Sequence, residues 1–449
     1  MYGLQTPIPF AVAPIAESGE LVWKPFVTER IGSLAGHLVG DAWIAITDVG
    51  APRGRLVSIA LDNATLNDPS TWAELVGESD AVMRFLTPVG DELYVADLVD
   101  TYSQVRVFDR TGAARGLVPL PGRGSVAELP FAMMNLFPPG RPDEFLFSFS
   151  TFTASPGCFS HRPGATGVEM LSGPAVTLPG TVVEDGWATS ADGTRIPYHL
   201  VRRRDVLLNR PRPALIYGYG GYNAAWLPAY PREMAAFVDS GGVYVHVHLR
   251  GGSEFGREWW EQGRRKNKTN GYADLYAIAE DLIATGVTGP DVLAVTGASN
   301  GGTLAGIAAV QRPDLFAVTV PRVPHLDLIG ACGDGYGRYT VNLELADADD
   351  PDEVRRLAGF SPYHLVKEGI VYPAVFVDAG DTDPRCPPWH ARKYAARMQA
   401  ATSGDAPILV HVWRNVGHGW ATDAETALTE HTEWLAFTMK ILGMRPREV

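Results

Sequence analysis

The chain has 449 residues, of which 46% are hydrophobic and 20% are charged. This balance is typical of a globular protein with a large core, and the length predicts two or three domains. The 38 basic and 51 acidic residues leave a formal charge of −13. That charge disfavours nucleic acids and anionic membrane surfaces as partners.

The three cysteines, Cys158, Cys332 and Cys386, lie far apart in the sequence. An odd number of isolated cysteines predicts neither a disulfide framework nor a zinc cluster, and it fits a reducing, cytoplasmic setting. The first residues lack a basic stretch followed by an apolar core, and the sequence has no apolar run of about 18 residues. We therefore expect neither export nor a membrane-spanning helix.

Up to about residue 185, short β-type runs alternate with clusters of Gly, Pro, Asn and Asp. Paired runs recur about every 45 to 50 residues, which is the usual length of a β-propeller blade, although a β-sandwich fits nearly as well. We predict an all-β, propeller-like domain of about three blades over residues 1–185. The runs chosen as strands are Ala42–Ile46, Arg55–Ile59, Glu92–Ala96, Gln104–Phe108 and Glu144–Phe149.

After about residue 190, strands alternate with helices. The strands are near-continuous apolar runs, which are typical of strands buried on both faces of a parallel sheet. This order predicts a doubly wound α/β domain, of the α/β-hydrolase type, over residues 186–449. The predicted strands are Ala214–Gly218, Val243–Val247, Val292–Thr296, Ala374–Asp378 and Ile408–Val412, and the predicted helices are Asp274–Ala284, Thr303–Gln311, His390–Ala401 and Glu425–Leu442.

The hexapeptide Gly297-Ala298-Ser299-Asn300-Gly301-Gly302 lies between one of these strands and one of these helices. Ser299 therefore stands where a strand turns sharply into a helix, which is the setting of a nucleophile elbow. The glycines two residues before and after the serine let the tight turn close, and the helix N-terminus supplies N–H groups. We predict that Ser299 is a catalytic nucleophile; the plainer alternative is a structural glycine turn.

A serine hydroxyl is a weak nucleophile, so it needs a base, and the base needs an orienting acid. In α/β-hydrolases the acid and then the histidine follow the serine, each on a loop after a later strand. His418 follows the last predicted strand and has glycine on both sides, so we predict that it is the base. Asp378, Asp381 and Asp383 compete for the acid, and their spacing alone does not separate Asp381 from Asp383.

From about residue 185 to its end, the chain resembles the peptidase domain of the prolyl oligopeptidase family of serine peptidases. Residues 30–185 would then be blades of that family's β-propeller. A propeller usually needs four or more blades, so we expect that an N-terminal portion is missing; the alternative is an open array of blades. The motifs that carry the resemblance are Tyr217–Tyr222, Arg250–Gly256, Gly297–Gly302, Gln311–Phe316, Phe360–Tyr363, Asp383–Arg385 and Gly417–Gly419.

The resemblance implies a role for several single residues. Asp383 matches the family's catalytic aspartate, and Arg385 matches the arginine that holds a substrate carbonyl. Tyr219 matches the tyrosine whose hydroxyl forms the oxyanion hole together with the backbone N–H of the residue after the nucleophile, here Asn300. Tyr222, in the same motif as Tyr219, is assigned to the substrate site. The implied reaction is acyl transfer on short peptides, which needs neither a metal ion nor an organic cofactor.

Substrate preference stays open at this point. Prolyl enzymes stack an indole on the substrate proline, whereas the resemblance places Leu345 at or near that position. The related oligopeptidase B branch cleaves after Lys or Arg, and Glu344 or Asp347 would attract such a side chain. Residues 349–353 also read as the start of a helix over residues 354–358, where acids simply suit the helix dipole.

Two further functions compete with peptide hydrolysis. An esterase or aminoacyl hydrolase would use the same triad, because the chemistry does not distinguish an ester from an amide. A non-catalytic binding scaffold would present the loops of an incomplete propeller. The sequence gives no signal for an oligomeric state.

Overall fold

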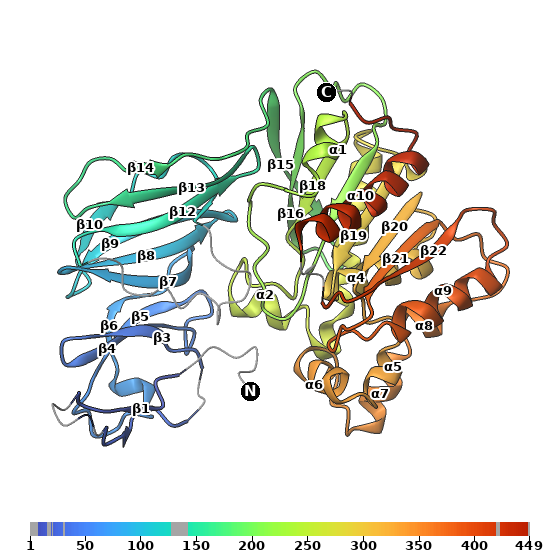
Figure 1. The fold of residues 1–449 in the computed structure, drawn as a ribbon. Helices are drawn as coiled ribbons and strands as arrows, with labels where there is room; N and C mark the ends of the chain where they lie inside the picture. Colours follow the sequence, from blue (N-terminus) through green and yellow to red (C-terminus); the bar gives the residue numbers. More distant parts are fainter. Residues whose placement is uncertain are drawn as a thin grey trace. The chain divides into compact units, whose positions relative to one another are not determined.

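The computed structural model of the chain divides into two compact units (Figure 1). Unit 1 consists of the chain up to Thr177 together with the segments Asn223–Tyr230 and Ser253–Trp259, and unit 2 is the remainder. The boundary expected at residue 185 falls inside a strand of unit 2, Thr181–Thr189, so unit 2 begins earlier, at Leu178. The structure describes residues 8–15, 19, 21–29, 32–126, 142–418 and 423–447.

The described part of unit 1 contains three four-stranded antiparallel sheets and a two-stranded one. Each four-stranded sheet is a meander of consecutive strands, which is the form of a propeller blade rather than of a sandwich. The sheets begin at Ala35, Val82 and Ser125, in agreement with the predicted repeat. The strands are β1 (Ala11–Val12) and β2 (Lys24–Pro25), then β3 (Ala35–Val39), β4 (Ala42–Thr47), β5 (Arg55–Ala60) and β6 (Ala73–Val76), then β7 (Val82–Val89), β8 (Glu92–Val99), β9 (Tyr102–Asp109) and β10 (Ala114–Leu117), and finally β11 (Ser125–Val126), β12 (Phe145–Thr151), β13 (Ala154–His161) and β14 (Glu169–Ser172).

Large apolar side chains fill the space between neighbouring sheets of unit 1. Tyr94 of β8 stacks on Phe145 of β12, with ring centroids 5.0 Å apart. Ile44 of β4 and Leu56 of β5 share a buried cluster with Leu93 of β8. This face-to-face packing follows from the alternation along each strand, which points every second side chain at the next sheet.

Unit 2 is built around an eight-stranded sheet with the order β15-β16-β18-β17-β19-β20-β21-β22. β15 and β16 pair antiparallel, as do β16 and β18, whereas the six strands from β18 to β22 in this order pair in parallel. Its parallel part contains the five predicted strands, each within about two residues of its predicted ends. The strands are β15 (Thr181–Thr189), β16 (Arg195–Arg203), β17 (Ala214–Tyr217), β18 (Val243–Val247), β19 (Leu293–Ala298), β20 (Val318–Arg322), β21 (Ala374–Gly380) and β22 (Ile408–Trp413).

Helices cover both faces of this sheet, as the apolar strands require. On β21, Val375 and Val377 pack with Tyr394 of α9 (Trp389–Ala401), whereas Phe376 points the other way and meets Phe437 of α10 (Ala424–Ile441). No helix among the described residues is long and apolar enough to cross a membrane. The helices are α1 (Ala235–Asp239), α2 (Arg257–Glu261), α3 (Thr269–Ala284), α4 (Asn300–Gln311), α5 (Leu328–Ala331), α6 (Gly335–Glu344), α7 (Pro351–Leu357), α8 (Pro362–Leu365), α9 (Trp389–Ala401) and α10 (Ala424–Ile441).

A buried carboxyl in unit 1 makes its stability depend on pH. Glu254 is 2% exposed, and its Oε1 accepts a hydrogen bond of 2.8 Å from the Trp226 backbone N–H. Burial raises the pKa of this carboxyl from 4.5 to about 7, against the weaker opposing effects of that hydrogen bond and of Arg84. The folded unit therefore keeps a proton that the unfolded chain releases. The contribution of Glu254 to the free energy of unfolding is complete below the pKa that its carboxyl has in the unfolded chain. This contribution is lost as the pH rises through the pKa of the carboxyl in the folded unit.

We expect Glu254→Gln to remove this loss of stability, because glutamine stays neutral. At about pH 8 the variant should be more stable than the wild type by on the order of 1–3 kcal/mol, and at about pH 5 the two should be nearly equal. Thermal unfolding at both pH values measures the difference. Glu258→Gln, at an exposed position of the same segment, is the matched control and should follow the wild type. Equal pH dependence in the wild type and Glu254→Gln would contradict the role given to Glu254.

Candidate active site

Ser299 sits in a strained turn between β19 and α4. Its φ of +61° is unusual for a residue other than glycine, and such strain is common at functional sites. The turn closes against the Gly218 carbonyl oxygen, which would lie 2.4 Å from a Cβ at Gly297 and 2.3 Å from one at Gly301. Only glycine fits at those two positions. The Ser299 N–H is held by the Arg322 carbonyl at 2.9 Å.

A continuous set of hydrogen bonds connects Ser299, His418 and Asp383. His418 Nε2 lies 2.9 Å from Ser299 Oγ, and His418 Nδ1 lies 2.7 Å from Asp383 Oδ2. The three residues follow β19, β22 and β21, so they meet at the carboxyl edge of the parallel strands. The other carboxylate oxygen of Asp383 accepts bonds from the backbone N–H groups of Arg385 and Cys386, at 2.8 and 3.0 Å. These two bonds fix the carboxylate against the imidazole.

The structure separates the three candidate aspartates. Asp383 is 3% exposed and contacts His418, as described above. Asp381 is exposed, and its Oδ1 accepts a hydrogen bond of 2.7 Å from the Asn415 backbone N–H, so it joins two loops. Asp378 is buried in β21 and pairs with Arg322 at 3.1 Å. Of the three, Asp383 is the one bonded to the histidine.

Tyr219 is buried on the loop that follows β17, and it hydrogen-bonds to the Ser299 side chain. Burial raises the pKa of the Tyr219 hydroxyl, and the nearby Glu344 carboxylate raises it further, while the bond with Ser299 opposes both effects. The hydroxyl therefore stays protonated and is a donor beside the serine. Asn300 is the first residue of α4, where backbone N–H groups have no acceptor within the helix.

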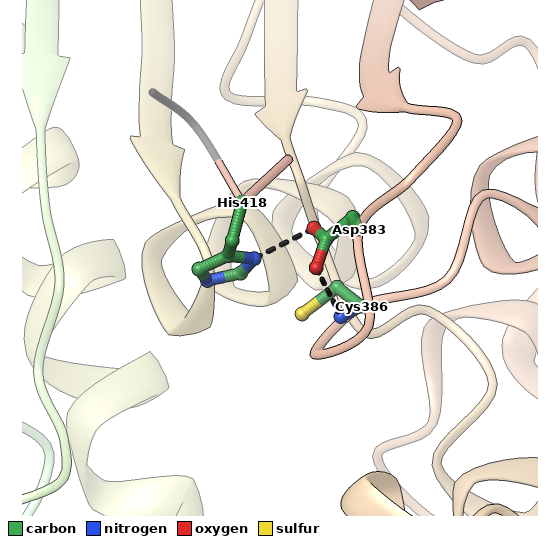
Figure 2. A group of neighbouring side chains, drawn as sticks. All are labelled: Asp383, Cys386 and His418. Carbon is green, nitrogen blue, oxygen red and sulfur yellow. Dashed lines mark hydrogen bonds and ion pairs between the residues drawn. The ribbon is translucent and has the colours of Figure 1, made fainter. Parts of the chain in front are cut away.

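Figure 2 shows the side chains of Asp383, Cys386 and His418 close to one another. One ligand atom from each lies within 4.8 Å of the others, which is close enough to share a metal ion. Asp383 and His418, however, are bonded to each other as an acid and a base are in a triad. Cys386 is buried, and burial raises the pKa of its thiol well above the usual value, which disfavours the thiolate that a metal binds. The group is therefore arranged as an acid and a base rather than as a set of metal ligands.

Arg385 lies next to residues that sequence reasoning missed. Its guanidinium carbon is 6.0 Å from the centre of the Tyr336 ring in α6, and its carbonyl accepts a hydrogen bond of 2.6 Å from His325 Nε2. Tyr336 stands in a glycine-rich stretch with no clear periodicity, and His325 follows β20 without a motif. No local sequence signal would have identified either residue.

Two expected substrate-binding residues are placed differently from their prediction. Glu344 is 0% exposed, and its Oε1 forms an ion pair with Lys268 Nζ at 3.0 Å. Its other oxygen accepts a bond of 3.0 Å from Trp260 Nε1, so the carboxylate has no free face for a basic substrate. Leu345 caps the C-terminus of α6 and is 3% exposed, so it packs in the core. The structure thus places Glu344 against Lys268 and Trp260, and Leu345 among buried side chains.

Tyr222 and the acidic residues that follow Leu345 mostly make contacts with nearby backbone groups. Tyr222 is half-buried, with a φ of +57°, and its hydroxyl donates a hydrogen bond of 3.4 Å to the Thr340 carbonyl, so it lies against α6. Asp347 is exposed and accepts a bond from the Asp349 N–H. Asp350 caps the N-terminus of α7, because its side chain accepts hydrogen bonds from the backbone N–H groups of Asp352 and Glu353. This supports the interpretation of residues 349–353 as the start of a helix.

Comparison with known proteins identifies relatives of both units. The model of the prolyl oligopeptidase family matches residues 228–445, and the model of its N-terminal β-propeller domain matches residues 15–154. The chain is similar to the prolyl endopeptidase of Elizabethkingia miricola, with 30% identity over 413 residues. That match covers 90% of this chain and 56% of the relative.

Solved structures agree with these matches. One, from a structural and mechanistic study of two prolyl endopeptidases, shares 32% identity and a TM-score of 0.87, over 95% of this chain and 62% of the other. Oligopeptidase B from Leishmania major shares 25% identity and a TM-score of 0.81, over 95% of this chain and 61% of the other. The chain thus spans less than two thirds of each of these relatives. With a β-propeller domain followed by a peptidase domain, the chain belongs to the prolyl oligopeptidase family.

Proposed function

We propose that this chain is a serine peptidase that hydrolyses peptide bonds of short peptides. Ser299 is the nucleophile, His418 the general base and Asp383 the acid that orients it. The observation that carries the proposal is the unbroken series of hydrogen bonds from Ser299 Oγ to His418, at 2.9 Å, and from His418 to Asp383, at 2.7 Å. Both distances are those at which a proton passes between side chains.

The geometry supports a two-step acyl transfer. His418 Nε2 takes the proton of Ser299 as its Oγ attacks the carbonyl carbon of the peptide. Asp383 stabilises the imidazolium, which then gives the proton to the leaving amine, so the C–N bond breaks and an acyl-enzyme forms. Water repeats the same sequence and releases the acid. The negative charge that develops on the carbonyl oxygen is stabilised by the Tyr219 hydroxyl and the Asn300 N–H.

Arg385 favours a peptide over a simple ester as substrate. It directly follows the loop of the catalytic acid, and its backbone is fixed on both sides by Asp383 and His325. A guanidinium held in this way suits the carbonyl of a second peptide unit, which a simple ester lacks.

We propose further that the residue before the scissile bond is proline rather than lysine or arginine. The Glu344 carboxylate, which would attract a basic side chain, is already neutralised by Lys268. The half-buried Tyr336 ring beside Arg385 offers an aromatic face on which a proline ring can stack.

A panel of N-blocked dipeptide amides with a fluorogenic leaving group tests this proposal. Its members carry Pro, Arg or Ala before the scissile bond and are otherwise identical. We expect kcat/KM for the Pro substrate to exceed the other two by at least about tenfold. Highest activity on the Arg substrate would support oligopeptidase B-like cleavage instead, and activity on matched esters alone would support an esterase.

We also propose a cytoplasmic location, supported by three cysteines that are all free in the structure. Alkylation under denaturing conditions, directly on cell lysis, should modify all three thiols. A disulfide found in the protein by mass spectrometry would contradict this location.

Removing the Tyr219 hydroxyl should affect the chemical step. We expect Tyr219→Phe to lower kcat by about 100- to 1000-fold, with KM changed only a few-fold, because the hydroxyl stabilises charge that exists only in the transition state. Steady-state kinetics on the best substrate of the panel measures both constants. Tyr276→Phe also removes a hydrogen-bonded hydroxyl, one that bonds Gln311 at the far end of α4, and should behave as the wild type. A loss confined to KM would contradict the role given to Tyr219.

A further inference from the structure

A buried ion pair lies behind the loop that carries Tyr219. The side chains of Lys268 and Glu344 are 1% and 0% exposed, and their charged atoms are 3.0 Å apart. Lys268 is the N-cap residue just before α3, and Glu344 is the last residue of α6, so the pair joins two helices of unit 2. Both charges are shielded from solvent. Removing charges from water is costly.

Lys268 also holds the loop itself. Its Nζ donates a hydrogen bond of 3.0 Å to the Gly220 carbonyl. The preceding carbonyl, of Tyr219, accepts a bond from Asn300 Nδ2. Two successive carbonyls of the loop are therefore held by side chains from two different helix starts. The fit is close, because a Cβ at Gly221 would lie 2.6 Å from Asn300 Nδ2 and 2.8 Å from Lys268 Nζ.

Helix α3 does not account for a lysine at this position. Lys268 occupies the N-cap of α3 and makes no capping hydrogen bond. A cation is unfavourable at a helix N-terminus, where the dipole is positive and Ser, Thr, Asp and Asn are the effective caps. The bonds that Lys268 does make go to Gly220 and Glu344.

We propose that Lys268 and Glu344 are positioning residues for the oxyanion hole. Lys268 fixes the Gly220 carbonyl so that the Tyr219 hydroxyl stays aimed at the oxyanion, and Glu344 neutralises the buried ammonium. A donor is effective only when it is in place before the charge develops. A displacement of about 1 Å can lower a rate by about 100-fold. The inference rests on the proposed function, because it assigns these residues to the same reaction.

The double variant Lys268→Met/Glu344→Met tests the inference, because it removes both charges and keeps similar side-chain volumes. We expect kcat to fall by about 10- to 100-fold, with KM within about threefold. Affinity for a peptide aldehyde, whose adduct oxygen occupies the oxyanion hole, should fall in parallel with kcat. Asp97→Met/Arg106→Met, which removes an ion pair of 2.6 Å in unit 1, is the matched control and should keep kcat.

The decisive comparison repeats the double variant in Tyr219→Phe. In the Tyr219→Phe background, we expect the double variant to lower kcat by a further factor of less than about three. The reason is that the effects of residues that act through one group are not additive. Equal losses of kcat in both backgrounds, or no loss in either, would overturn the inference. Glu344→Gln, which keeps the shape of the side chain, provides the same comparison if the double variant does not fold. A wild-type protein with no activity on the peptide panel would instead refute the proposed function itself.

Discussion

Replacing Ser299 with alanine is expected to lower kcat/KM for the best peptide substrate by about 10⁴- to 10⁶-fold. The substitution removes the atom that forms the acyl-enzyme, so only binding and the oxyanion donors remain to accelerate attack by water. The fold should persist, because alanine replaces a single oxygen and the turn is defined by the glycines packed on Gly218.

The control for this variant is Ser403→Ala, at an exposed serine of the same unit. It should retain activity within about twofold, as surface substitutions normally do. Circular dichroism and thermal unfolding establish that Ser299→Ala is folded. If folded Ser299→Ala keeps wild-type kcat, the assignment of the nucleophile is wrong.

Asp383→Asn is expected to lower kcat by about 10⁴-fold while changing KM little. Asparagine keeps the size of the side chain but loses the negative charge that stabilises the imidazolium. It also favours the wrong tautomer of His418, since its amide can donate to Nδ1 instead of accepting from it. Steady-state kinetics with the same substrate measures the effect.

Asp381→Asn is the matched control, two residues away in the same loop. Asp381 is exposed and bonds the Asn415 N–H rather than the histidine, so its variant should lose less than about threefold in kcat. If Asp381→Asn lost most of its kcat while Asp383→Asn kept a kcat near that of the wild type, the assignment of the acid would be reversed.

The sequence was most informative where one local pattern implies one local structure. The apolar runs that became β19, β21 and β22 lie within about two residues of their predicted ends, because a strand buried on both faces has few alternatives. The elbow at Ser299 was equally readable, since Gly297 and Gly301 meet a carbonyl oxygen that excludes any Cβ.

Features that depend on tertiary contacts could not be predicted from a local sequence pattern. Asp381 and Asp383 share one loop and one residue type, and only the position of His418 separates them. Glu344 looked like a carboxylate for a basic substrate because its partner Lys268 belongs to a distant part of the sequence. The boundary near residue 185 was placed late because β15 pairs antiparallel with β16 and so resembles the strands of the propeller.

Covalent labelling with a fluorophosphonate tests the central claim most directly, because the reagent forms a bond with an activated serine irrespective of substrate preference. The folded wild type should gain one adduct, located by peptide mapping on Ser299, and Ser299→Ala should gain none under the same conditions. A folded wild type that takes up no reagent, or an adduct on another residue that persists in Ser299→Ala, would contradict the account.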